Sequence, residues 1–525
     1  MHISTPRYIL APEDTSTTYT NAGDLLVQLN KSFGTNILIS YSGLADALKH
    51  LINEKHDFGA IYARLRALWP SSAPGRDTKS CNIWKELQKV EESVRRHERM
   101  RHDSIKNNGI IQNAIHIPPR RIWDLYAHRV IPYEYESSNL DVSPKNIEHL
   151  FKKDSELAYY NFFILPASIS GHRIKRNYVA VSHSWVKNPK PIFTNVNARQ
   201  WPVCLPNDVT LEDVRNQLLD LGAEFVWLDI LCLRQVSNNP DHEILRENEW
   251  TIDIPTIGYI YRHSKNVMRY FNGLGREFNP CGWKDKCHWT QRASTLQECC
   301  WNETINVGDD PSHPIIKRKA GDDPNLVLEE LIGFSRYGEF YNILTLTSLM
   351  AKRHAYNPVD RVSGLTSLLC TDSLPTYSLG EAEEDAWVRL LDHIPFNQHK
   401  FLVFSPYIGD GCCSWHPSWA QVMGMKTDKT KTPSHASFSG KFHVLENCQV
   451  SPTSNGGYRI QYRQFTFSAN LISGAVDKGE YTVLQWGSDL CGCRQKGGRL
   501  QKVAKLVCKR GFYITDAPPK IVTLC

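Results

Sequence analysis

No stretch of this 525-residue chain is apolar over the ~18 residues that a membrane-spanning helix needs, and the longest candidate, around Tyr159 to Ile164, is far shorter. The first residues also lack the succession of charged, apolar and small residues that marks a signal peptide. The net charge of +6 is a mild excess that indicates neither nucleic acid nor a membrane surface as a partner. We therefore expect a soluble, cytoplasmic protein that binds neither of them.

Several signature motifs of nucleotide, metal and nucleophile chemistry are also missing. The sequence has no G-x-G-x-x-G, no P-loop, no H-E-x-x-H and no G-x-S-x-G. Without a P-loop there is no sign of a nucleotide-driven oligomerisation motor. Activation would then depend on an external partner, which the sequence does not identify, or on self-association, which we expect.

Material for a core is plentiful. Hydrophobic residues make up 41% of the chain and charged residues 22%, with 14 Trp, 22 Tyr and 19 Phe. This composition excludes a mostly disordered chain. At about 150 residues per domain, the length predicts three or four units.

The cysteines are expected to be reduced thiols. There are 15, an odd number scattered through a chain without a signal peptide. Two groups raise the alternative of zinc, but neither supplies the paired spacings of a zinc site, so free thiols are favoured: Cys281, Cys287-His288 and Cys299-Cys300; Cys491, Cys493 and Cys508. We therefore predict no metal site. Cys232 is a candidate nucleophile without an identifiable histidine partner, and a small buried apolar residue is the favoured alternative.

Helical spacing of apolar residues predicts a helical N-terminal region over residues 1–117. Its third helix, from Ile83 to Arg101, carries a run of arginines (Arg95, Arg96, Arg99, Arg101) interleaved with glutamates. A solvated helix face is favoured over a site for an acidic partner. Two prolines at 118–119 then break the chain and open a connecting segment over 118–176.

Strands and helices alternate over 177–301. Apolar runs at Tyr178–Val181, Phe225–Leu228 and Val267–Phe271 predict strands. Helices are expected after Thr210, which has Asp213 at capping-box spacing, from about Glu243 to Arg262 with an interruption at Pro255, and from Thr295. This order predicts an α/β core built on a parallel sheet with helices on both faces. A helical extension over 302–370 and a β-rich C-terminal domain over 371–525 complete the expected organisation.

Ligands bind such sheets beyond the carboxyl ends of the strands, and polar residues gather there. Ser182-His183 and Asp229 follow the first two strands, and Glu298 follows the third at the start of a helix. On a helix, Ser294 and Glu298 would lie on the same face, because they are four residues apart. Ser182 and His183 are adjacent in an extended segment, so their side chains point to opposite faces. An ordinary helix-surface glutamate is the alternative for Glu298, and the one that the sequence alone favours.

These segments resemble the sequence blocks of fungal heterokaryon-incompatibility (HET) domains. The similarity lies in YVAVSHSW from Tyr178, FVWLDILCLRQ from Phe225, a helix containing Ile257, Ile260 and Tyr261, the Arg292–Glu298 block, and Asp360-Arg361-Val362. Two residues depart from the family pattern: His183 stands where Tyr is usual, and Ser294 where Trp is usual. The resemblance covers about a quarter of the chain closely and Asn177 to Leu369 more loosely, and it leaves both ends of the chain unexplained.

The resemblance implies a role in fungal self/nonself recognition and programmed cell death, and a flavodoxin-like fold related to Toll/interleukin-1 receptor (TIR) domains. Enzymatic TIR domains cleave NAD with a glutamate, which corresponds to Glu298 as the catalytic residue. The resemblance then makes strand-end residues the candidates for binding NAD, as substrate rather than cofactor: Ser182, Trp185, Asp229, Gln235 and Arg292. A structural ion pair between Asp229 and Arg292 is an equal alternative. The second functional hypothesis is a non-catalytic signalling module with the same fold.

Overall fold

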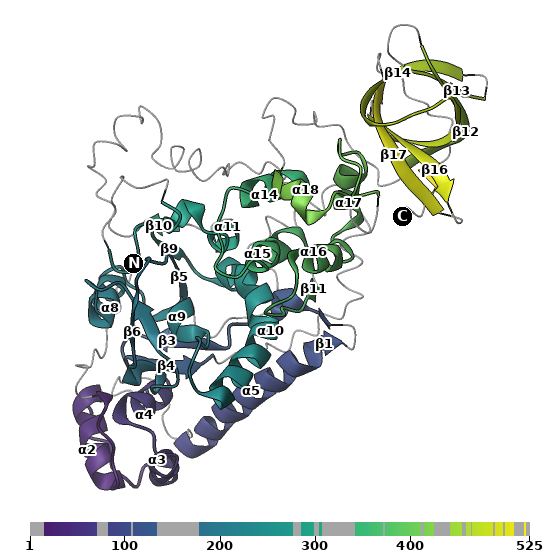
Figure 1. The fold of residues 1–525 in the computed structure, drawn as a ribbon. Helices are drawn as coiled ribbons and strands as arrows, with labels where there is room; N and C mark the ends of the chain where they lie inside the picture. The colour runs from purple at the N-terminus through teal and green to yellow at the C-terminus, as the bar shows by residue number, and fades with distance from the viewer. Residues whose placement is uncertain are drawn as a thin grey trace. The chain divides into compact units, whose positions relative to one another are not determined.

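The computed structural model describes residues 15–70, 82–106, 109–133, 178–276, 285–298, 304–306, 342–370, 373–410, 414–424, 442–453, 458–463, 465–486, 489–496, 499–508 and 519–520. The chain divides into two compact units (Figure 1). Unit 1 comprises residues 1–318 together with 376–378, and unit 2 comprises 319–375 and 379–525.

A mixed β-sheet forms the centre of unit 1. Its order is β10 (Thr304–Asn306), β9 (Val267–Tyr270), β5 (Val179–His183), β8 (Phe225–Leu228), β3 (Arg121–Asp124) and β4 (Arg129–Pro132). The first four of these are mutually parallel, which confirms the three strands expected from the sequence. The hairpin β3–β4 joins β8 in antiparallel fashion, so the prediction of a purely parallel sheet was wrong. The hairpin lies in the segment predicted to be only a connection.

The connections between the parallel strands set the position of the candidate site. From β5 the chain passes through α8 (Leu211–Asp220) to β8 on one side, and then through α10 (Pro240–His263) to β9 on the other side of β5. The predicted capping box at the start of α8 is present, with the Asp213 backbone N–H donating to Thr210 Oγ1 (3.1 Å). The carboxyl end of β5 is therefore the point at which the strand order reverses.

Pro255 does not interrupt α10, contrary to expectation. A proline inside a helix has no N–H for the carbonyl four residues earlier. Here that carbonyl, on Thr251, accepts a hydrogen bond from the Tyr377 backbone N–H instead (3.0 Å). The Thr256 hydroxyl donates to the Ile252 carbonyl (3.0 Å) one turn on. The helix continues because these two groups satisfy carbonyls around the proline.

The N-terminal helices share one apolar core with the sheet. They are α2 (Ala22–Phe33), α3 (Leu44–Asn53), α4 (Phe58–Leu65) and α5 (Ile83–Ser104). Buried leucines and aromatic residues of these helices belong to the same cluster as the buried faces of β3, β5, β8 and β9. The predicted helices are confirmed, and they pack as one body with the α/β core.

A buried carboxylate holds α5 against α10. The Asp253 carboxylate accepts hydrogen bonds from Arg101 Nη1 at 3.0 Å and from Arg120 Nε at 2.9 Å. Both Asp253 and Arg101 are 2% exposed. Burial alone would raise the pKa of Asp253, but the two guanidinium groups hold it below its usual value. Arg101 is thus part of the interior, and its expected place on a solvated face was wrong, whereas Arg95, Arg96 and Arg99 are exposed.

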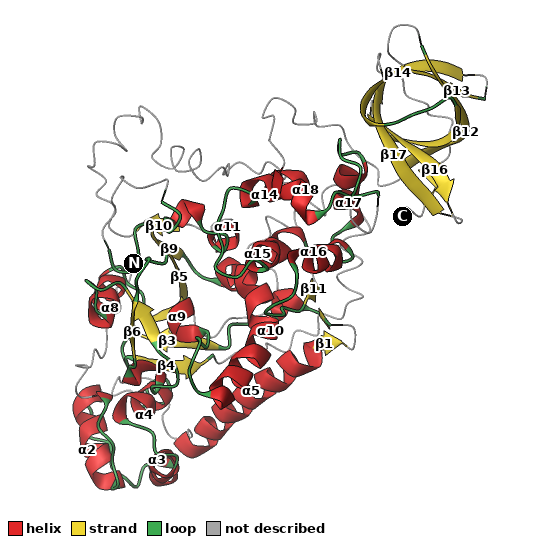
Figure 2. Cartoon of the chain, in the orientation of Figure 1, coloured by secondary structure: helices red, strands yellow, loops and turns green. Residues whose placement is uncertain are grey.

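Unit 2 contains helices and a closed β-barrel. The helices are α14 (Ile343–Met350), α15 (Asp360–Leu369), α16 (Glu383–Leu391), α17 (Phe396–Val403) and α18 (Trp419–Gly424), with a short strand β11 (Leu374–Pro375). The antiparallel strands are β12 (Phe442–Pro452), β13 (Tyr458–Tyr462), β14 (Phe465–Gly474), β15 (Gly479–Trp486), β16 (Asp489–Lys496) and β17 (Arg499–Cys508). Because β13 pairs with both β14 and β12, the ring closes (Figure 2).

The β-rich character of the C-terminal region is confirmed, and β18 (Pro519–Lys520) adds a short pairing to β12. Residues 307–341 of the expected helical extension and residues 509–518 of the expected β-rich domain lie outside the described residues. Within the part of the chain that the structure describes, the helices are too short or too polar to cross a bilayer.

Replacing Asp253 tests the buried ionic cluster. We expect Asp253→Asn to lower the free energy of unfolding of unit 1 by about 3–5 kcal/mol, because it leaves two buried guanidinium groups without their charge partner. Urea denaturation of the full chain measures the change. Glu247→Gln, on an exposed position of α10, is the control and should change stability by less than about 0.5 kcal/mol. Equal stability of the two variants would contradict this account.

Candidate functional site

A buried cluster of polar side chains lies at the carboxyl end of β5. Ser182 Oγ donates to Glu298 Oε2 at 2.5 Å, and the indole Nε1 of Trp289 donates to Ser182 Oγ at 2.6 Å. Ser182 is fully buried and Glu298 is 7% exposed. Glu298 ends the short helix α11 (Thr295–Glu298), and Ser294, four residues earlier, also hydrogen-bonds its carboxyl group. Glu298 is thus an interior carboxyl group at the strand ends, and the helix-surface alternative was wrong.

Burial dominates the ionisation of Glu298. It raises the pKa of the carboxyl group to about 7, against the lowering effect of the hydrogen bonds from Ser182 and Ser294. The charge of Asp229 raises it further, and the nearby His183 lowers it. Near neutral pH, Glu298 is divided between its acid and its carboxylate form, as suits a group that exchanges charge or protons during a reaction.

His183 and Asp229 form the second pair of the cluster. His183 Nε2 lies 2.7 Å from Asp229 Oδ1, and Nδ1 lies 3.2 Å from the carbonyl oxygen of Ser184. Because both ring nitrogens face oxygen acceptors, the imidazolium form satisfies both of them. Burial would lower the pKa of His183, but Asp229 raises it above the usual value. The Asp229 side chain is 25% exposed, so it is the member of the cluster nearest to solvent.

Two of the other predicted site residues, Trp185 and Gln235, contact this pair. Trp185 is half-buried, with its ring centroid 5.9 Å from that of His183. Gln235 Nε2 donates to the backbone carbonyl of Asp229 at 3.2 Å and so fixes the turn after β8. Arg292 lies in the turn before α11, where its carbonyl oxygen accepts from Thr295 Oγ1 at 2.8 Å. The carboxylate of Asp229 is paired with His183 rather than with Arg292.

Two residues of the cluster, Trp289 and Tyr261, escaped sequence reasoning, and so did the pairing of a third. His183 was placed at the end of the first strand without a role, and its Nε2 lies 2.7 Å from Asp229 Oδ1. Trp289 is fully buried under the guanidinium of Arg269, whose Cζ lies 4.5 Å from the indole centroid. Tyr261 donates to the Val181 carbonyl at 2.9 Å and also hydrogen-bonds Glu298. Only Tyr261 had a signal, since it belongs to the helix block that prompted the family resemblance.

The structure does not support the two cysteine hypotheses, a nucleophile at Cys232 and a zinc site, among the described residues. Cys232 is fully buried, with its Sγ directed at the Val226 carbonyl (3.9 Å), and burial raises the pKa of its thiol to about 12. A thiol held protonated in this way fits the buried apolar alternative. Among the described residues, no three possible metal ligands gather, while Cys281, Cys299 and Cys300 fall outside them.

The fold and this cluster define a class of protein: an α/β domain with a buried glutamate at the point where the strand order reverses. Residues 178–316 match the family model of the Heterokaryon incompatibility protein (HET). That segment contains the candidate site residues and four strands of the sheet. No curated protein and no solved structure was found to match the chain.

The raised pKa of Glu298 predicts a stability difference that depends on pH. The folded protein favours the neutral acid, so its stabilising effect is complete below about pH 4.5 and is lost as pH rises through about 7. We expect Glu298→Gln, which stays neutral, to match the wild type at pH 4 and to exceed it by about 3 kcal/mol at pH 8.5. Denaturation curves at the two pH values measure this difference. A constant difference between the two proteins would contradict the raised pKa.

Proposed function

We propose that the chain acts in heterokaryon incompatibility, as an effector of fungal self/nonself recognition and programmed cell death, and that its central domain cleaves NAD. The single observation that carries the catalytic part is the Glu298 carboxyl group, buried at the strand ends and held by Ser182 and Ser294. The family match at 178–316 supports the biological part.

The topology adds support for a nucleotide-type site. In chain order, the parallel strands β5, β8, β9 and β10 have the spatial order 2-1-3-4, which is the order of flavodoxin-like sheets. In such sheets the ligand lies beside the first strand, where the order reverses. Ser182 and His183 end that strand, and Asp229 begins the turn after its neighbour. A flavodoxin-like fold related to TIR domains is therefore part of the proposal.

The proposed reaction is hydrolysis of the bond between nicotinamide and ribose. The C1′–N bond breaks with its electron pair leaving on nicotinamide, water adds to C1′, and the water proton is released. Positive charge develops on the ribose ring as the bond breaks, and the carboxylate form of Glu298 stabilises it. Asp229, whose side chain is a quarter exposed, accepts a hydrogen bond from a ribose hydroxyl group. Trp185, whose ring lies beside that of His183, supplies an aromatic face to the ligand.

One observation favours the second candidate, a non-catalytic signalling module that acts by self-association. Glu298 is 7% exposed, and its carboxyl group already has hydroxyl partners within the protein. A fully satisfied polar network of this kind also specifies a unique packing of the domain. In this alternative, Glu298 is structural and the partner binds elsewhere.

Replacement of Glu298 in the full chain separates the two candidates. With the chain at high concentration, so that association is not limiting, we expect NAD consumption that falls at least about 100-fold in Glu298→Gln. The wild-type rate should rise with pH through about 7, as Glu298 ionises. Glu247→Gln, on an exposed position of α10, should keep the wild-type rate.

Toxicity on expression in fungal cells supplies the second measurement. The enzymatic proposal expects loss of toxicity in Glu298→Gln, provided that the variant is folded and accumulates as the wild type does. Toxicity that persists in this variant, together with no NAD turnover in either protein, would overturn NAD cleavage and favour the signalling module.

A further inference from the structure

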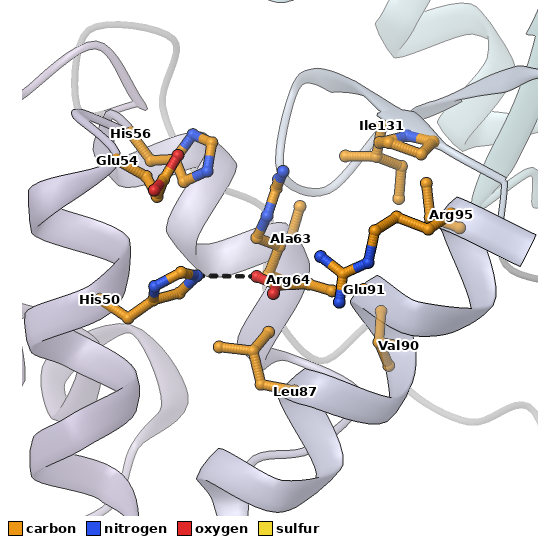
Figure 3. A pocket seen from close by; sticks show the side chains of 12 residues that line it. His50, Glu54, His56, Ala63, Arg64, Leu87, Val90, Glu91, Arg95 and Ile131 are labelled. Carbon is orange, nitrogen blue, oxygen red and sulfur yellow. Dashed lines mark hydrogen bonds and ion pairs between the residues drawn. The ribbon is translucent and has the colours of Figure 1, made fainter. Parts of the chain in front are cut away.

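The N-terminal helices enclose a second site, which lies outside the segment that matches the HET family. A cavity of about 330 Å³ opens between α3, α4 and α5 and the end of β4 (Figure 3). Its volume corresponds to about ten water molecules, which is room for a ligand of roughly ten non-hydrogen atoms. Cavities of this size are at the lower end of those that proteins use for small molecules.

One wall of the cavity is aliphatic. It is made by Leu87, Val90 and Val94, which share one face of α5, and by Ile131 of β4. Leu87 is fully buried and Ile131 is 4% exposed, so this wall is continuous with the core. Among the described residues that line the cavity there is no Phe, Tyr or Trp. The site therefore offers an apolar chain a surface to bury, and its only aromatic rings among the described lining residues are the imidazoles of His50 and His56.

Cationic groups from two helices face the same space. Arg64 extends from α4 and Arg95 from α5, and Arg95 makes no ion pair with any described residue. Of the two carboxylates that line the cavity, Glu91 is engaged by His50 Nε2 at 2.9 Å (Figure 3), and Glu54 is exposed at the end of α3. His56 is kept neutral because burial and the neighbouring Arg64 lower its pKa to about 4. The lining therefore carries two carboxylates and two guanidinium groups, and the guanidinium groups are its partners for an anionic ligand.

We propose that this cavity binds a small aliphatic monocarboxylate, with its carboxylate between Arg64 and Arg95 and its hydrocarbon chain along Leu87, Val90 and Val94. Guanidinium groups bind carboxylates through paired N–H donors, and the aliphatic wall removes the chain from water. The neutral His56 imidazole adds a donor beside Arg64. The proposal is independent of NAD cleavage, because its residues lie on α3, α4, α5 and β4.

Calorimetric titration of the full chain with sodium octanoate tests this proposal. Octanoate has ten non-hydrogen atoms, and we expect saturable binding at one site per chain. Arg95→Gln and Arg64→Gln should each weaken binding at least about tenfold, because each removes a charged donor. Arg99→Gln, an exposed position one turn along α5 that does not line the cavity, should bind as the wild type does.

A second variant tests the aliphatic wall without changing charge. Val90→Met fills part of the cavity from a half-buried position. We expect it to weaken the binding of octanoate more than the binding of butyrate, because octanoate has the longer chain. The proposal is overturned if octanoate gives no saturable heat, if octylamine binds as well as octanoate, or if Arg95→Gln and Arg99→Gln bind alike. Tighter binding of inorganic phosphate or adenosine monophosphate than of octanoate at this cavity would also overturn it.

Discussion

The architecture of unit 1 depends on neutralising one buried carboxylate. Asp253 lies in the middle of α10, and an unpaired charge at this depth would cost several kcal/mol. Arg101 reaches it from the end of α5, and Arg120 from the segment just before β3. These two contacts tie the end of α5 and the segment before the β3–β4 hairpin to α10, and so join the N-terminal helices to the sheet that holds the candidate site.

Burial also raises the pKa of a carboxyl group in the candidate site, but there no guanidinium group among the described residues offsets it. Asp253 keeps its charge because two guanidinium groups surround it, whereas Glu298 is surrounded by hydroxyl groups and apolar walls, and its pKa rises to about 7. Asp229, at the same strand ends, is paired with His183 and raises the pKa of that imidazole above its usual value. The two carboxyl groups therefore lie in different surroundings, Glu298 among hydroxyl groups and Asp229 beside an imidazole.

Local patterns in the sequence predicted the helices and strands better than the long-range contacts between them. The runs at Phe225–Leu228 and Val267–Tyr270 and the Thr210 cap were confirmed, because burial on both faces and capping are local properties. The continuity of α10 through Pro255 was not predictable, since the compensating donor comes from Tyr377, more than a hundred residues later.

The site followed the same division. Ser182, Asp229 and Glu298 were predicted to gather because the carboxyl ends of parallel strands meet at one edge. The contact of Trp289 with Ser182 was missed, since no periodicity connects a loop indole to a strand hydroxyl. The burial of Arg101 was missed for a related reason: charge pattern along a helix does not say which turn meets a distant carboxylate.

Residues 376–378 belong to unit 1, although the residues before and after them belong to unit 2. Unit 1 is therefore not continuous in the sequence. The Tyr377 N–H that satisfies Thr251 is synthesised only after α14 and α15 of the other unit. During translation, the Thr251 carbonyl therefore has no partner from this stretch until residues 376–378 leave the ribosome. A gene fragment that ends with the family match would encode α10 without this donor, so it would lack one contact that the full chain gives the helix.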